Sequence, residues 1–226
     1  MSKAIIVVDF AYKGTQRKGH GTGRKGLSST LKYLQYRDKV QNRLAANRDY
    51  ERWQDHGMGL HWRDIMKNSD NLQSKHVLSW TWVISPAPDL MALIPEAERR
   101  DVVCDLTERI VEDYYLERGF GVPEYSYILH DREAKMEDEE ETMQQLHTHV
   151  VLPGTAPLDG VDRAAVYNNK ERGHDVLFRE IASRHFSAAL DRIVGPEWQL
   201  LREEPELEPE QPAPNDLDAW FPRSRT

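Results

Sequence analysis

The chain has 226 residues, of which 39% are hydrophobic and 30% are charged, and its formal net charge is −8. This length and composition exclude a fibrous or wholly unstructured protein and are typical of one sizeable globular domain with appendages. No apolar run approaches the roughly 18 residues of a membrane-spanning helix, and the single cysteine, Cys104, excludes an internal disulfide and a cysteine-based zinc site. We therefore expect a cytoplasmic protein without membrane insertion.

The charge is distributed unevenly along the chain. Residues 1–48 contain eleven Lys or Arg against two acidic residues, which gives +9, so the other 178 residues carry −17. Such asymmetry indicates a basic binding site on an acidic protein, although a merely solvated basic loop is the alternative. The predicted nucleic-acid contacts are Lys13, Arg17, Lys18, Arg24 and Lys25.

The first third of the chain predicts a strand, a loop and a helix in that order. Residues 4–10, AIIVVDF, form a β-branched apolar run typical of a buried strand. The Gly-rich and basic residues 11–25 predict a flexible loop. Leucines at near-helical spacing predict a helix from about residue 29 to residue 47. Residues 51–75 lack firm periodicity and predict a small lobe of short helices.

The middle of the chain alternates between strand and helix patterns. Three predicted strands and two predicted helices follow: strands at 76–86, 123–130 and 146–153, and helices at 95–120 and 175–194, with an acidic connector at 131–145. This order predicts an α+β domain in which an antiparallel β-sheet of about five strands is covered by helices.

The C-terminal segment differs in composition from the rest. From residue 203, the sequence EEPELEPEQPAPNDLD is acidic and rich in proline, which predicts disorder. We therefore expect a catalytic or binding domain over residues 1–200 and a disordered acidic tail over residues 201–226. The tail carries two aromatic residues in DLDAWFP, 216–222, so residues 203–226 could dock on a partner protein.

Histidines provide the candidate metal ligands. Within LHTHVVLPG, residues 146–154, the strand period of two places His147 and His149 on one face. His130 ends the preceding predicted strand, and a hairpin between the two strands would bring three imidazoles around one divalent ion with coordination positions left open, as a catalytic metal needs. Glu133 is the candidate carboxylate ligand or supporting partner, and Asp131 competes for that role.

These motifs together resemble those of the HUH endonucleases, in particular the relaxases that mobilise plasmids and nick the T-DNA border. The resemblance rests on HDREAK and LHTHVVL, preceded by SWTWVISP and a helix, and on LKYLQYRDK at 31–39, and it extends over about residues 1–195. It implies that Mg²⁺ or Mn²⁺ is held at the scissile phosphate by His130, His147 and His149. It also implies that Tyr33 is the nucleophile; Tyr36, one turn along, is the alternative.

The resemblance predicts a site-specific single-stranded DNA nickase and strand transferase, acting at an origin-like site in mobilisation of a plasmid or mobile element. A dication and nearby positive charge would lower the pKa of a tyrosine nucleophile, and Arg37, one turn from Tyr33, is placed to contribute. The implied intermediate is a 5′-phosphotyrosine.

Other functions remain open at the level of sequence. Within the same superfamily, the alternatives are a rolling-circle replication initiator and a transposase. Outside it, they are a histidine-triad-like nucleotide hydrolase, a cupin-like metalloenzyme and a non-catalytic module that binds DNA and recruits partners.

Overall fold

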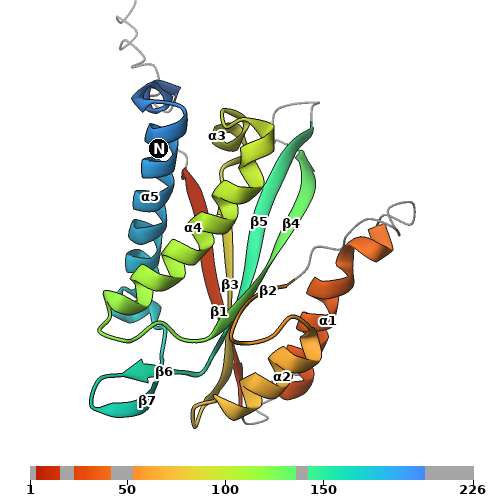
Figure 1. Cartoon of the computed structure of the whole chain (residues 1–226), viewed down its shortest axis with the longest axis vertical. Coiled ribbons are helices and arrows are strands. Elements are labelled where there is room, and N and C mark those ends of the chain that lie inside the picture. The colour runs from red at the N-terminus through yellow and green to blue at the C-terminus, as the bar shows by residue number, and fades with distance from the viewer. Residues whose placement is uncertain (1–3, 16–22, 42–52, 136–141, 202–226) are drawn as a thin grey trace, which may run out of the picture.

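The computed structural model describes residues 4–15, 23–41, 53–135 and 142–201. Its centre is a five-stranded antiparallel sheet (Figure 1) in the order β1-β3-β5-β4-β2. The strands are β1 (Ile6–Gly14), β3 (Val77–Pro86), β5 (Thr142–Pro153), β4 (Tyr125–Lys135) and β2 (Gln54–His56). The histidine-bearing strands β4 and β5 are direct neighbours in the interior of the sheet, with β3 and β2 on either side of the pair.

One face of the sheet is covered by α3 (Pro88–Ala92), α4 (Glu96–Leu116) and α5 (His174–Ile193). Their core is aromatic: the ring centroid of Trp82 lies 4.6 Å from that of Phe178 and 5.0 Å from that of Tyr114. Thr148 of β5 also points to this face, since its Oγ1 lies 2.7 Å from Oγ1 of Thr107 on α4. This packing buries the larger of the two hydrophobic clusters.

The opposite face is covered by α1 (Arg24–Gln41) and α2 (Trp62–Asn71). Leu27, Leu31 and Leu34 are buried on one side of α1, where they pack with α2 and with residues of the sheet such as Ile128 and Val151. The leucine spacing that predicted this helix is therefore the spacing of its buried face. Because Val151 and Ile128 share their strand faces with the histidines, α1 covers the face that carries them.

Smaller elements complete the domain. A hairpin of β6 (Thr155–Leu158) and β7 (Val161–Ala165) follows β5, and short 3₁₀ turns lie at Lys170–Arg172 and Pro196–Leu201. Gly154 permits the tight exit from β5, because a Cβ there would lie 1.9 Å from the carbonyl oxygen of Val77. No helix in the described ranges is long and apolar enough to cross a membrane.

The predicted α+β class and five-stranded antiparallel sheet are confirmed, but several boundaries differ. Residues 11–14 and 24–25, predicted as loop, belong to β1 and α1. The predicted helical lobe at 51–75 contains one helix, and its β2 segment pairs with β4 in the main sheet. The connector at 131–145 is largely strand, because β4 and β5 extend into it.

The remaining predictions concern segments that lie outside the described residues. They concern residues 16–22 of the basic loop, residues 42–47 of the first helix, the centre of the acidic connector at 136–141, and the tail from residue 202.

Candidate active site

The three predicted histidines lie together on the α1-covered face of the sheet. His130 is the direct antiparallel partner of His147 in the β4–β5 ladder, and His149 lies one strand period further along β5. Their ring centroids are 5.0–5.5 Å apart. One ligand atom from each ring lies within 4.8 Å of the other two, and His130 and His147 are buried.

Hydrogen bonds to backbone carbonyls orient two of the rings. Nε2 of His130 lies 3.0 Å from the carbonyl oxygen of Leu34, and Nδ1 of His147 lies 3.4 Å from that of Gln145. A carbonyl oxygen can only accept, so these nitrogens carry the protons in the neutral rings. Nδ1 of His130 and Nε2 of His147 are then the nitrogens with lone pairs. Metal-bound histidines usually show this arrangement, in which the second nitrogen donates to a carbonyl.

The spacing of the histidines fits a divalent ion. Two imidazole nitrogens bound to one tetrahedral ion at about 2.1 Å lie about 3.4 Å apart, so ligand atoms at the observed limit of 4.8 Å would move about 1.4 Å closer on binding. Three neutral imidazoles would not neutralise the charge of the ion, and they would leave some of its coordination positions open. The residues therefore fit an ion that also binds an anionic ligand such as a phosphate.

Helix α1 brings the tyrosine segment to the histidines. The carbonyl of Leu34 contacts His130, and Tyr33, the adjacent residue, has a side chain that is 57% exposed. Tyr36 is directed instead toward the start of α2, where its hydroxyl lies 3.4 Å from Nε2 of His61. Because Nδ1 of His61 accepts from the backbone N–H of Arg63, Nε2 carries the proton and donates to Tyr36. The two candidate nucleophiles therefore lie in different surroundings.

The tyrosines of the other face are unsuited to act as nucleophiles. Tyr114, Tyr115, Tyr125 and Tyr127 are buried in the α4–α5 core. Burial raises the pKa of Tyr114 to about 12, and burial likewise raises the pKa of the other three. A buried phenol that resists ionisation cannot reach a phosphate, which leaves exposed tyrosines such as Tyr33.

The other predicted site residues are not all brought to the histidines. The carboxylate of Asp131 lies on the α4 face, where it accepts from Gln144 at 2.8 Å and from Arg100 of α4 at 3.4 Å. Adjacent strand residues point to opposite faces, so Asp131 and His130 are separated by the sheet. Glu133 lies in β4 and Arg37 in α1, and both side chains are outside the described part of the structure.

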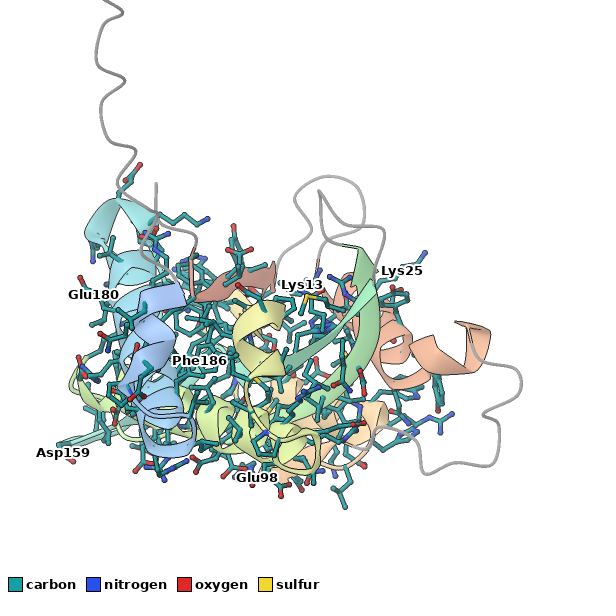
Figure 2. The ribbon with its side chains drawn as sticks, turned by 90° about the horizontal axis from the view of Figure 1, so that it is seen from above. Lys13, Lys25, Glu98, Asp159, Glu180 and Phe186 are labelled. Atoms are coloured by element: carbon teal, nitrogen blue, oxygen red, sulfur yellow. The ribbon has the colours of Figure 1, made fainter. Side chains whose placement is uncertain are left out.

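The predicted basic contacts are partly described. Lys13 lies in β1, and Lys25 lies in the first turn of α1 next to Arg24, whose side chain is 72% exposed and pairs with Asp70 at 2.8 Å. Lys13 and Lys25 lie toward α1, whereas Glu98 and Glu180 lie on the side of α4 and α5 (Figure 2). Arg17 and Lys18 are outside the described residues.

Two sets of contacts were not predicted from the sequence. His61 contacts Tyr36, as described above. In addition, Nε of Arg132 donates to Oε1 of Gln145 at 2.7 Å, and Nε2 of Gln145 donates to Ser85 at 3.1 Å. The strand period could have placed Arg132 on the face of His130, since the two are two residues apart.

Comparison with known proteins supports the fold. No family model and no curated protein matches the sequence. Among solved structures, the chain is similar to the conjugative relaxase TrwC in a copper-bound complex with oriT DNA, with a TM-score of 0.51 and 13% identity over 82% of this chain and 70% of that chain. It is also similar to TrwC complexed with a 27-mer DNA comprising the recognition hairpin and the cleavage site, with a TM-score of 0.50 and 12% identity over 82% of this chain and 69% of that chain. The chain therefore has the relaxase fold that its motifs predicted.

Proposed function

We propose that this protein is a metal-dependent, single-strand-specific DNA nickase and strand transferase that acts in conjugative mobilisation. The observation that carries the proposal is the contact between α1 and the histidines, in which the Leu34 carbonyl lies 3.0 Å from Nε2 of His130. This contact joins a segment with an exposed tyrosine to a cluster of three imidazoles. The relaxase fold and the oriT DNA bound to the structural neighbours support the same function.

The proposed metal ligands are His130, His147 and His149, holding Mg²⁺ or Mn²⁺. When bound, the ion polarises a non-bridging phosphate oxygen and stabilises the charge that develops in the transition state. The protein's part is to fix the rings. The β4–β5 ladder sets their spacing, and the carbonyls of Leu34 and Gln145 set the orientation of the His130 and His147 rings.

The proposed nucleophile is Tyr33. Its phenolic oxygen attacks the phosphorus, a new O–P bond forms, and the bond from phosphorus to the 3′ oxygen breaks. The phenolic proton is released to solvent, and the departing 3′ oxygen is protonated to a hydroxyl. Because the product is a 5′-phosphotyrosine ester, the reaction conserves the phosphodiester energy for strand rejoining. Arg37 is proposed to stabilise the phenolate, and Lys13, Arg17, Lys18, Arg24 and Lys25 are proposed to contact the DNA backbone.

We further propose that residues 1–200 form the catalytic domain of a cytoplasmic protein and that residues 203–226 dock on a protein of the transfer or replication machinery. A role in rolling-circle replication or transposition would use the same chemistry at a different DNA site. These settings differ in the DNA recognised and in the partner.

Incubation of the protein with pooled single-stranded oligonucleotides and Mn²⁺ tests the chemistry. We expect a covalent protein–DNA species that survives denaturing electrophoresis and is absent after chelation or in the His147→Ala/His149→Ala variant. Metal-dependent cleavage without any covalent species would replace the tyrosine mechanism with a water-using nuclease. Binding without cleavage under all metals would favour a non-catalytic recruitment module.

A further inference from the structure

Helices α1 and α2 enclose a groove on the outer surface of the domain. It has a volume of about 680 Å³, and its lining includes Arg24 and Lys25 of α1 together with Trp62, Arg63 and Lys67 of α2. Asp70 is the acidic residue of the lining and pairs with Arg24. Four cationic side chains and one carboxylate give this groove a net positive charge on a protein whose total is −8.

These cations lie at positions where positive charge destabilises the helices that carry them. Arg24 and Lys25 begin α1, which has no acidic residue in its first turn, and positive charge is unfavourable at the positive end of the helix dipole. Arg63 and Lys67 are spaced i and i+4 on α2, where like charges repel. Binding of an anion in the groove would relieve both costs. The pattern therefore indicates a ligand with several negative charges.

Trp62, which lines the groove, contacts two cations. Nζ of Lys32 lies 4.4 Å from the centroid of the Trp62 ring, and Cζ of Arg63 lies 4.9 Å from it. The backbone N–H of Trp62 donates to Oε1 of Gln35 at 2.9 Å, which fixes the start of α2 against α1. Since the ring already contacts two cations, it positions charge for a phosphate and is not a free platform for a base.

The helix that lines the groove, α1, also contacts the histidines. From Arg24 to Leu34, whose carbonyl contacts His130, α1 rises by about 15 Å at ~1.5 Å per residue. That length corresponds to about four nucleotides at the ~3.4 Å axial rise of B-form DNA, and to fewer in an extended single strand. Lys32 and Trp62 lie between the two ends, so positive charge is present along the path.

We propose that the α1–α2 groove binds the phosphate backbone of the DNA strand outside the cleavage point, without reading its sequence. This inference rests on the proposed DNA-nicking function. It adds α2, through Arg63 and Lys67, to the basic N-terminal residues as a DNA-binding element. Binding here would anchor the strand while the tyrosine segment on the same helix engages the scissile phosphate.

The test is fluorescence anisotropy with an oligothymidylate of about 30 nucleotides over a range of salt concentrations. The variant Arg63→Gln/Lys67→Gln is compared with Arg109→Gln/Arg179→Gln, which removes the same charge from α4 and α5 on the other face. We expect the α2 variant to bind at least about tenfold more weakly at low salt. Its slope of log affinity against log salt should fall by about 1.4, or ~0.7 per lost phosphate contact, and the control should match the wild type.

Three results would overturn the inference, and they separate it from the proposed function. Equal affinity and slope in the α2 variant and the wild type would reject the groove, while adduct formation by the wild type would leave the nickase intact. Equal losses of DNA affinity in the α2 variant and the control would show that the loss comes from the change in net charge and not from the groove. A wild-type protein that binds no single-stranded DNA and forms no adduct would reject both. Thermal unfolding of each variant establishes that the exposed substitutions leave the fold intact.

Discussion

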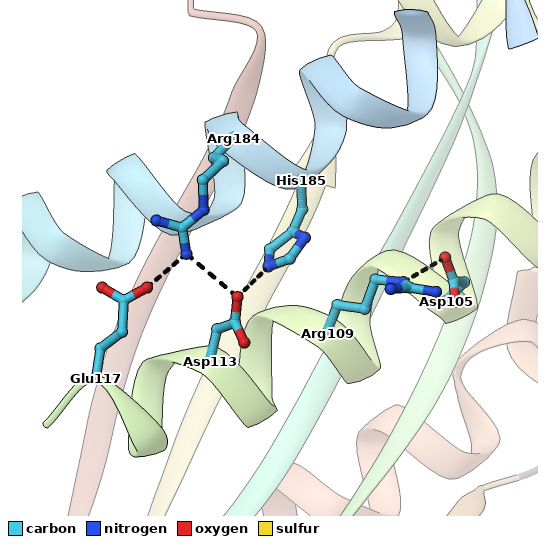
Figure 3. Close-up of polar contacts among 6 residues, drawn as sticks. All are labelled: Asp105, Arg109, Asp113, Glu117, Arg184 and His185. Carbon is cyan, nitrogen blue, oxygen red and sulfur yellow. Dashed lines mark hydrogen bonds and ion pairs between the residues drawn. The ribbon is translucent and has the colours of Figure 1, made fainter. Parts of the chain in front are cut away.

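The two faces of the sheet are built differently. On the α4–α5 face, charged side chains are matched with partners: Arg184 of α5 contacts both Asp113 and Glu117 of α4, and Nε2 of His185 lies 2.7 Å from Asp113 (Figure 3). Beneath these pairs lies the aromatic core. On the α1–α2 face, the sheet presents three histidines, two of them buried, and the groove carries more cations than acids.

The two faces therefore differ in role: one mainly stabilises the fold, and the other carries the candidate site. The α4–α5 face, with these ion pairs and the larger apolar core, stabilises the fold. A face with imidazoles and excess cations is costly for the fold alone, and this cost would fall on binding of a metal and a polyanion, as proposed above. Substitutions on one face should therefore change stability, and substitutions on the other should change binding.

The largest expected effect on stability comes from the aromatic core. Phe178 is 1% exposed and packs on Trp82, so Phe178→Ala should lower the free energy of unfolding by about 3–5 kcal/mol. Urea denaturation measures this change. Tyr33→Phe, on the other face, should stay within about 0.5 kcal/mol of the wild type. A comparable loss from both substitutions would contradict the division between faces.

Metal affinity should depend on the opposite face. Removing His147 and His149 together should weaken Mn²⁺ binding at least about a hundredfold, and the wild type should bind Mn²⁺ more tightly than Mg²⁺, because imidazole suits transition metals. Isothermal calorimetry measures both affinities. The matched control is His185→Gln, which removes an imidazole from the α4–α5 face. Unchanged affinity in the double variant would show that the cluster is not the metal site.

Thr148 lies between the two histidines in the sequence, but its side chain lies on the opposite face of the sheet. Thr107 donates to the carbonyl of Val103, so the Thr148 hydroxyl donates to Thr107 in the 2.7 Å contact between them. Thr148→Val should destabilise the fold by about 1–2 kcal/mol and leave Mn²⁺ affinity unchanged. If Thr148→Val instead weakened metal binding without loss of stability, the assignment of faces along β5 would be wrong.

A smaller, pH-dependent contribution is expected from Glu124. Burial alone would raise the pKa of Glu124, but hydrogen bonds from Arg163 at 2.7 and 2.9 Å hold it below its ordinary value of 4.5. A carboxyl with a lowered folded-state pKa adds stability above 4.5, and this contribution is lost as the pH falls through the folded-state value. The pair is partly exposed, so the effect should be at most about 1 kcal/mol.

The matched measurement is the unfolding free energy of wild type and Glu124→Gln from pH 7 to pH 2. The two curves should converge at acid pH. A constant difference across this range would mean that the side chain contributes through packing and not through its charge.

Much of the fold and of the histidine cluster could be predicted, because both follow from local periodicity. The period of two in LHTHVVLP placed the histidines on one face, and the leucine spacing of α1 gave its buried side. The same period could have predicted that Asp131 and His130 lie on opposite faces of the sheet. Pairing along β4 and β5 extended these strands into a charged segment whose residue types are uncommon in strands.

The parts that the sequence did not predict depend on tertiary contacts. The contacts of Leu34 with His130 and of Tyr36 with His61 join segments far apart in the chain, and no local pattern signals them. The three-residue strand β2 is too short for a periodic signal, and it forms because β4 offers an edge for pairing.

In the proposed mechanism, the tyrosine on α1 attacks a phosphate held at the histidine cluster. Peptide mapping of the covalent DNA adduct after proteolysis identifies the attacking residue. We predict that the nucleotide is attached to Tyr33, that Tyr33→Phe abolishes the adduct while folding and DNA binding persist, and that Tyr36→Phe keeps most of the activity. A nucleotide attached to Tyr36, or to a histidine, would contradict the claim.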